Sequence, residues 1–193
     1  MPSPAPYMNS REAMWLPSMS GFYDNFAQPL AWVGLRVLTG GMLIYSGWPK
    51  IMAPMAQAGF VESLNFYPGW LWSPFLAAQQ FFGGIAIVLG LFTRPIALAN
   101  AVMLAITLWF HAVNRYGDAF LTPAGVEFMK AGGAEYFTSE ATARLADGGA
   151  RFLAQVQDKA NLLSLLWTAA AAFFAAFGGG MWSVDRGILK KEF

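Results

Sequence analysis

The chain has 193 residues, of which 56% are hydrophobic, 16% are aromatic and only 12% are charged, and it contains no cysteine. This composition leaves too little polar surface to cover a water-soluble globule, so it indicates a polytopic membrane protein with one domain. The net charge of +1 excludes a basic field for nucleic acid, and the absence of thiols excludes disulfides, thiolate metal sites and iron–sulfur clusters.

The N-terminal segment, residues 1–28, is rich in proline and methionine and has neither a basic start nor an uninterrupted apolar core. We expect an extramembrane or interfacial segment here and not a cleavable signal peptide. The first apolar run covers about residues 30–48 and contains one charge, Arg36. Its guanidinium either reaches the near interface and pairs with a carboxylate there, or faces the bundle and marks a site.

Residues 71–92 and 95–113 form two further runs, each long enough to cross about 30 Å of hydrocarbon. The corner around Arg94 is so short that these two spans must be antiparallel neighbours. Small residues, which let helices approach closely in lipid, recur along both spans. These packing positions are Gly83, Gly84, Gly90, Ala97, Ala101 and Ala105.

A fourth apolar run covers residues 162–182 and follows an extramembrane loop at 114–160. We therefore predict an all-α integral membrane fold, an antiparallel four-transmembrane-helix bundle over residues 29–185 with short interfacial helices in its loops. A short C-terminal tail, residues 186–193, follows. Basic residues close to the membrane at Arg94, Arg186, Lys190 and Lys191 favour cytoplasmic termini.

Polar and aromatic residues gather at one end of the predicted bundle, and they include Tyr45, Gln80, Trp109 and His111. A quinone headgroup needs hydrogen-bond donors and aromatic or aliphatic walls, so these residues are a candidate quinone pocket. The alternative is an interfacial aromatic belt with amides that bond across helices. His111 is the only histidine, so a bis-histidine haem cannot form within the chain.

At the other end, Arg36 lies at a depth comparable with the two glycines of the second span and near Asp185. We predict an Arg36–Asp185 ion pair that joins the first span to the end of the fourth. Loss of one partner would leave a costly charge in a poorly solvated place.

Three segments resemble signatures of the DoxX family of four-helix bacterial membrane proteins: LRVLTGGMLIYSGWPK, QQFFGGIAIVLGLFTRP and GGGMWSVD. The resemblance implies the bacterial inner membrane and an association with quinone-linked oxidoreductases such as thiosulfate:quinone oxidoreductase. The family commonly has glutamate where Gln80 stands and histidine where Ser46 stands, and both differences remove a titratable group.

Two functional hypotheses follow. In the first, the chain is a mainly structural or accessory subunit, not catalytic on its own, of a larger respiratory or photosynthetic membrane complex. It would contact lipids through its spans, and other subunits through its N-terminal segment and its loop. In the second, it is the membrane subunit of a quinone-linked oxidoreductase. Quinone and bound lipids are the only ligands that we expect, and no metal is expected.

Overall fold

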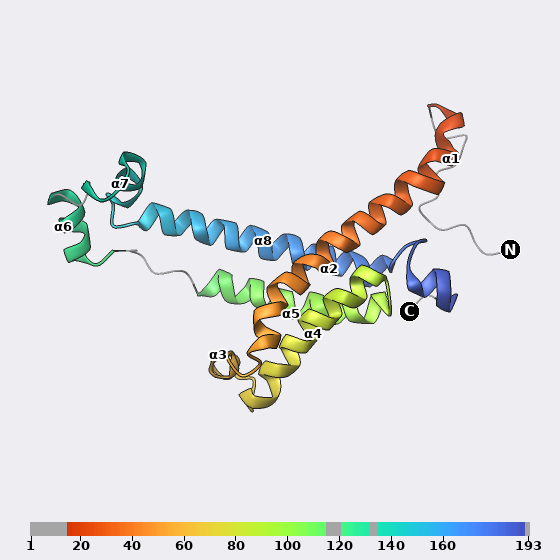
Figure 1. The fold of residues 1–193 in the computed structure, drawn as a ribbon, viewed down its shortest axis with the longest axis horizontal. Coiled ribbons are helices and arrows are strands. Elements are labelled where there is room, and N and C mark those ends of the chain that lie inside the picture. The colour runs from red at the N-terminus through yellow and green to blue at the C-terminus, as the bar shows by residue number, and fades with distance from the viewer. Residues whose placement is uncertain (1–14, 115–120, 132–134, 192–193) are drawn as a thin grey trace. The chain divides into compact units, whose positions relative to one another are not determined.

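The computed structural model describes residues 15–114, 121–131 and 135–191 (Figure 1). The described chain is helical, with the elements η2 (Pro17–Met19), α1 (Ser20–Phe22), η3 (Tyr23–Ala27), α2 (Gln28–Met52), α3 (Ala58–Ser63), α4 (Gly69–Leu89), α5 (Thr93–Val113), α6 (Pro123–Ala131), α7 (Ser139–Leu145), α8 (Ala150–Phe177) and η5 (Asp185–Leu189). Within these residues, four segments are long and apolar enough to cross a membrane: Pro17–Met52, Gly69–Leu89, Thr93–Val113 and Ala150–Phe177. The predicted all-α membrane fold with four spans is confirmed.

Two of the spanning helices end earlier than the hydropathy pattern predicts, and glycines cause both early ends. The fourth run was expected to continue to Trp182, but α8 ends at Phe177 because Gly178 and Gly180 have φ angles of +75° and +78°. The second run ends at Leu89 for the same reason, since Gly90 has a φ of +70°. Left-handed backbone stops a helix, and glycine adopts it without a Cβ penalty.

The chain divides into two compact units, residues 1–103 with 169–193 (unit 1) and residues 104–168 (unit 2), and both α5 and α8 contribute to each. In unit 1, α2 and α4 approach backbone to backbone. A Cβ on Gly40 would lie 2.5 Å from the Gly84 carbonyl oxygen, and one on Gly84 would lie 2.7 Å from the Gly40 oxygen. The predicted role of Gly84 in packing thus has a partner glycine on α2.

The other predicted packing positions differ in their burial. Ala97 and Ala101 are buried, whereas Ala105 is exposed and Leu104 is buried in its place. A spacing of four residues drifts around a helix of 3.6 residues per turn, so the third member of the stripe leaves the packed face. Gly83 faces α5, because a Cβ there would overlap the buried amide of Asn100.

Unit 1 also holds the end of α8. The indole of Trp32 lies 4.8 Å from the ring of Phe173 and 5.9 Å from that of Phe174, and Phe174 is fully buried. The beginning of α2 is therefore packed on the end of α8.

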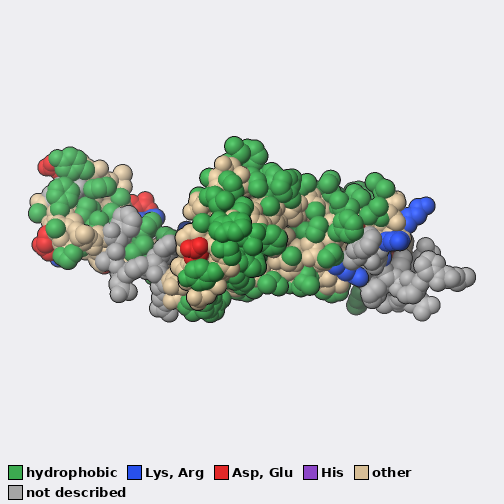
Figure 2. All heavy atoms as spheres, turned by 90° about the horizontal axis from the view of Figure 1, so that it is seen from below, with side chains coloured by type: hydrophobic (Ala, Val, Ile, Leu, Met, Phe, Trp, Pro, Cys, Tyr) green, Lys and Arg blue, Asp and Glu red, His purple; other side chains and the backbone are tan. Residues whose placement is uncertain are grey.

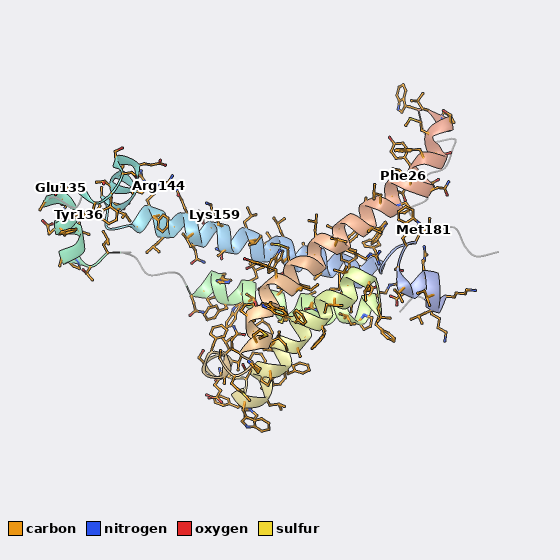
Figure 3. All side chains as sticks on the ribbon, viewed as in Figure 1. Phe26, Glu135, Tyr136, Arg144, Lys159 and Met181 are labelled. Atoms are coloured by element: carbon orange, nitrogen blue, oxygen red, sulfur yellow. The ribbon has the colours of Figure 1, made fainter. Side chains whose placement is uncertain are left out.

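Unit 2 contains the loop that was predicted to be extramembrane, and two short helices, α6 and α7, lie within it. Thr138 caps α7 by accepting a hydrogen bond from the amide of Ala141 at 3.2 Å. Tyr136 stacks on Phe128 with ring centroids 6.3 Å apart (Figure 3). Gln157 on α8 donates to the His111 carbonyl of α5 at 2.6 Å.

Hydrophobic side chains cover much of the visible surface (Figure 2). On α4 the exposed side chains include Leu71, Phe75, Phe82 and Leu89. Apolar groups of this size on the outside of a helix suit contact with lipid chains, which are equally apolar.

The glycine contact between α2 and α4 gives a matched test. Gly40→Ala should lower the free energy of unfolding by about 1–3 kcal/mol, because its methyl group meets the backbone of α4. Gly41→Ala on the same helix should be neutral or slightly stabilising, because no atom lies within 4 Å of the added Cβ. Thermal unfolding in detergent measures both, and equal melting temperatures for the two variants would contradict the backbone contact.

Candidate functional site

The corner between α4 and α5 is formed by a few residues with unusual backbone. Gly90 caps α4 in the left-handed conformation, and the Leu91 amide donates back to the Ala86 carbonyl at 2.9 Å. Phe92 also has a positive φ, of 45°, and Thr93 then begins α5. The first amides of α5 consequently point out of the corner without an intrahelical partner.

The carboxylate of Asp185 satisfies these amides. Its Oδ1 accepts from the Phe92 amide at 2.8 Å, and its Oδ2 accepts from the Thr93 amide at 2.9 Å and from the Thr93 hydroxyl at 2.8 Å. The Asp185 amide in turn donates to the Gly90 carbonyl at 3.0 Å. A buried negative charge thus lies at the positive end of α5, where the helix dipole stabilises it.

Arg36 supplies the opposite charge nearby. It is 2% exposed, its Nη2 donates to the Trp182 carbonyl at 2.5 Å, and it interacts electrostatically with Asp185. Gly90 provides the space, because a Cβ at that position would overlap Arg36 Nη1. Of the two alternatives for Arg36, the structure has the guanidinium turned into the protein.

The predicted direct ion pair takes a different form. Arg36 binds the Trp182 carbonyl, and Asp185 binds the amides at the start of α5. Among the described residues, the ion pairs with an N···O distance of 4 Å or less do not include Arg36 with Asp185. The reason is geometric: the orphan amides at the start of α5 occupy the carboxylate, so the guanidinium binds a carbonyl three residues earlier. The two charges therefore attract each other without a direct contact.

The glycine run before this aspartate lets the segment pack closely. A Cβ on Gly179 would lie 2.8 Å from the Thr93 hydroxyl oxygen, and one on Gly180 would lie 2.9 Å from the Trp32 ring. We call residues 178–191 the C-terminal latch, because they tie α2, α4 and α5 together at one end of unit 1.

A second polar cluster lies in the α2–α4 interface. Gln80, which is 3% exposed, donates from Nε2 to the Ser46 hydroxyl at 3.0 Å and accepts at Oε1 from the Lys50 ammonium at 2.7 Å. Sequence reasoning identified Gln80 but missed Lys50. The available signal was the i, i+4 spacing of Ser46 and Lys50, which puts both on one helix face.

This cluster lies deep along the membrane-spanning helix. At 1.5 Å per residue, Gln80 is about 16 Å from Gly69 at one end of α4 and about 14 Å from Leu89 at the other. The Ser73 hydroxyl donates to the Pro54 carbonyl at 2.5 Å, so the chain just after α2 is level with the start of α4. Helical side chains tilt toward the N-terminus of their helix, which directs the Lys50 ammonium inward to Gln80.

The charge on Lys50 is only partly compensated. Lys50 lies in the last turn of α2, whose negative end offsets about 0.3–1 kcal/mol. Gln80 contributes a neutral acceptor, so a net cost remains.

The four residues of the predicted quinone pocket have different environments. Gln80 is buried in unit 1, whereas Tyr45 in the same unit is 80% exposed. Trp109 and His111 belong to unit 2, where Trp109 is exposed and the His111 carbonyl accepts from Gln157. The pocket as a four-residue set stays a prediction. Among the described residues, no group of three His, Cys, Asp or Glu side chains is placed to hold a metal.

The four apolar spans, with polar clusters buried between them, define a polytopic α-helical membrane protein. The DoxX family model matches residues 31–112, which comprise α2 from Ala31, α4, and α5 up to Ala112. Over these residues the chain is similar to the DoxX family. The third resembling segment, at residues 178–185, lies outside the matched region. No match was found among curated proteins or among solved structures.

The role of Asp185 in the latch can be tested against a second aspartate that also accepts amides at the start of a helix. Asp185→Asn should lower the free energy of unfolding by about 2–4 kcal/mol, because it removes a buried charge that accepts three hydrogen bonds beside Arg36. Asp147→Asn is the control, since Asp147 also accepts two amides at a helix start but is exposed, and it should cost about 1 kcal/mol. Chemical unfolding in detergent measures both. A loss for Asp185→Asn no larger than that of the control would contradict the account.

Proposed function

We propose that this protein is a member of the DoxX family and a mainly structural, accessory subunit of a larger energy-transducing membrane complex. In this role it holds no redox centre of its own and docks on another subunit through its N-terminal helical segment, Pro17–Ala27. The extramembrane loop in unit 2 offers a second contact.

The observation that carries the proposal is the length of the first spanning segment. Pro17–Met52 has 36 residues, about 54 Å at 1.5 Å per residue, whereas the hydrocarbon core is about 30 Å thick. An average tilt of about 20° shortens the crossing by only a few ångströms. A substantial part of the segment therefore extends beyond the hydrocarbon.

The extension nevertheless has an apolar surface. Phe22 and Phe26 are 49% and 51% exposed, Met19 and Tyr23 are exposed beside them, and Phe26 is labelled in Figure 3. The rings of Phe22 and Phe26 are 5.6 Å apart, so they form one patch. An apolar patch outside the hydrocarbon favours a protein partner that covers it.

The use of the buried polar residues also supports an accessory role. Gln80, Arg36 and Asp185 bind side chains or backbone of the same unit and hold its helices together. Groups engaged in this way stabilise a scaffold.

We further propose the bacterial inner membrane, with cytoplasmic termini, as the location. The support is the exposed Lys190 and Lys191 next to Arg186 at the end of the latch, because basic residues close to a span favour the cytoplasmic side. Blue side chains gather at this end in Figure 2.

A quinone-linked oxidoreductase subunit is the second candidate. The observation that favours it is the row of hydrogen-bonding groups on Ser46, Gln80 and Lys50, because quinone carbonyls accept hydrogen bonds. Loss of quinone reduction in a Gln80→Leu or His111→Ala variant that still assembles would favour this candidate over the accessory role.

Co-elution after purification in a mild detergent tests the accessory role. The wild-type chain should elute in fixed proportion with a larger complex, and the double variant Phe22→Ser, Phe26→Ser should elute alone with an unchanged melting temperature. Phe75→Ser on the lipid-facing side of α4 is the control and should still co-elute. Deleting the gene should weaken assembly of the complex while the assembled remainder keeps its redox turnover. A wild-type chain that elutes alone would contradict the proposal.

A further inference from the structure

The end of the C-terminal latch carries an excess of positive charge. After Asp185, the sequence has three basic residues and one acid: Arg186, Lys190, Lys191 and Glu192. Asp185 itself offers little negative charge at the surface, because it is buried and its carboxylate is bound to the start of α5. Lys190 and Lys191 are exposed, and the ion pairs found among the described residues do not include them. The two lysines therefore present their charge at the surface.

The hydrogen bonds of the latch hold this charge at the end of the spans. The latch follows the last residue of α8, Phe177, and the Asp185 amide donates to the Gly90 carbonyl at the α4–α5 corner. The Lys191 amide then donates to the Asp185 carbonyl at 3.0 Å, so the chain between them stays close to this corner. Since one spanning helix begins and two end here, the lysines lie at the level of the lipid headgroups.

Exposed apolar side chains accompany the lysines. Ile188 is 72% exposed, Leu189 beside it in η5 is exposed, and so is Trp182 earlier in the latch. Tryptophan is enriched at membrane–water interfaces, and lysine can bury its apolar stem while its ammonium reaches the headgroups. Aliphatic and basic side chains in one short segment suit the boundary between acyl chains and headgroups.

We propose that Lys190 and Lys191 bind the headgroups of anionic phospholipids and so gather these lipids around the α4–α5 corner. Charge complementarity selects the lipid, because an anionic membrane surface attracts basic residues that lie within a Debye length of it. The inference goes beyond the proposed accessory role and does not depend on it.

Position and side-chain chemistry favour a lipid over an acidic protein segment or a free phosphate ion. Lipid headgroups surround the ends of membrane spans, which is where the latch lies. A lipid also has acyl chains, which Ile188 and Leu189 can contact while the lysines bind its headgroup. A free phosphate ion would engage the lysines alone and leave both apolar side chains in water.

A fluorescent label on the latch tests the proposal with the full chain in vesicles. The sequence has no cysteine, so Gly187→Cys gives a single labelling site, and no atom lies within 4 Å of a Cβ added there. Gly59→Cys on α3 is the matched control site, because Gly59 is exposed and equally open. The vesicles contain a majority of phosphatidylcholine and a minority of phosphatidylglycerol, with a trace of one or the other carrying an energy acceptor on its acyl chain.

Energy transfer then measures the local concentration of each lipid. At the Gly187→Cys site, phosphatidylglycerol should be enriched at least about fivefold over phosphatidylcholine, the effect of one basic residue near an anionic surface. At the Gly59→Cys site the enrichment should be absent. The enrichment at the latch should also fall in about 1 M salt, where the Debye length is about 3 Å.

Two double variants of the chain labelled on the latch show whether the lysines cause the enrichment. Lys190→Gln with Lys191→Gln should abolish it. Lys130→Gln with Lys159→Gln removes the same amount of charge from exposed positions outside the latch, and it should keep the full enrichment. The first double variant should keep the melting temperature of the wild type, because both of its side chains are exposed, so misfolding would not explain the loss.

Equal transfer to both lipids at the latch, or an unchanged enrichment in Lys190→Gln with Lys191→Gln, would overturn the inference. A poly-glutamate peptide and inorganic phosphate test the other two sources of negative charge. Neither should bind to the latch in phosphatidylcholine vesicles. Binding of either one that depends on the two lysines, together with no lipid preference, would also overturn the inference.

Discussion

The rest of unit 1 depends on the Asp185 carboxylate at the start of α5. Three donors from Phe92 and Thr93 converge on this carboxylate. Its position requires the chain to turn back after α8, which the glycines at 178–180 allow. One interaction therefore fixes the α4–α5 corner, the end of α8 and, through the Trp182 carbonyl, Arg36 on α2.

The two polar clusters of unit 1 differ in whether a buried charge has an opposite charge nearby. At the latch, an aspartate and an arginine are buried together and their charges compensate each other, which makes this end a structural anchor. At the α2–α4 interface, Lys50 has an amide and a hydroxyl network but no acid. A compensated cluster stabilises the bundle by itself, whereas a charge without an acidic partner costs free energy in the membrane. This contrast is why we assign scaffolding to the first cluster.

Hydropathy predicted the four spans because crossing a membrane needs long apolar runs whatever the helix contacts are. It misplaced the ends of α4 and α8, since the left-handed conformation of Gly90 or Gly178 is not encoded in hydropathy. Depth arguments brought Arg36 and Asp185 to one end of the protein, yet could not give their hydrogen-bond partners, which depend on how the latch folds back. Lys50 was missed because a lysine at a span end is ordinarily interpreted as interfacial, and only the tilt of its side chain directs it inward.

Hydrogen–deuterium exchange at the α4–α5 corner tests the central claim most directly. The chain in detergent would be compared with a version that ends at Phe177 and lacks the latch. The account predicts that the amides of Phe92 and Thr93, protected by Asp185 in the full chain, exchange rapidly without the latch, while amides in the middle of α4 stay protected. Equal protection of Phe92 and Thr93 in both chains would contradict it.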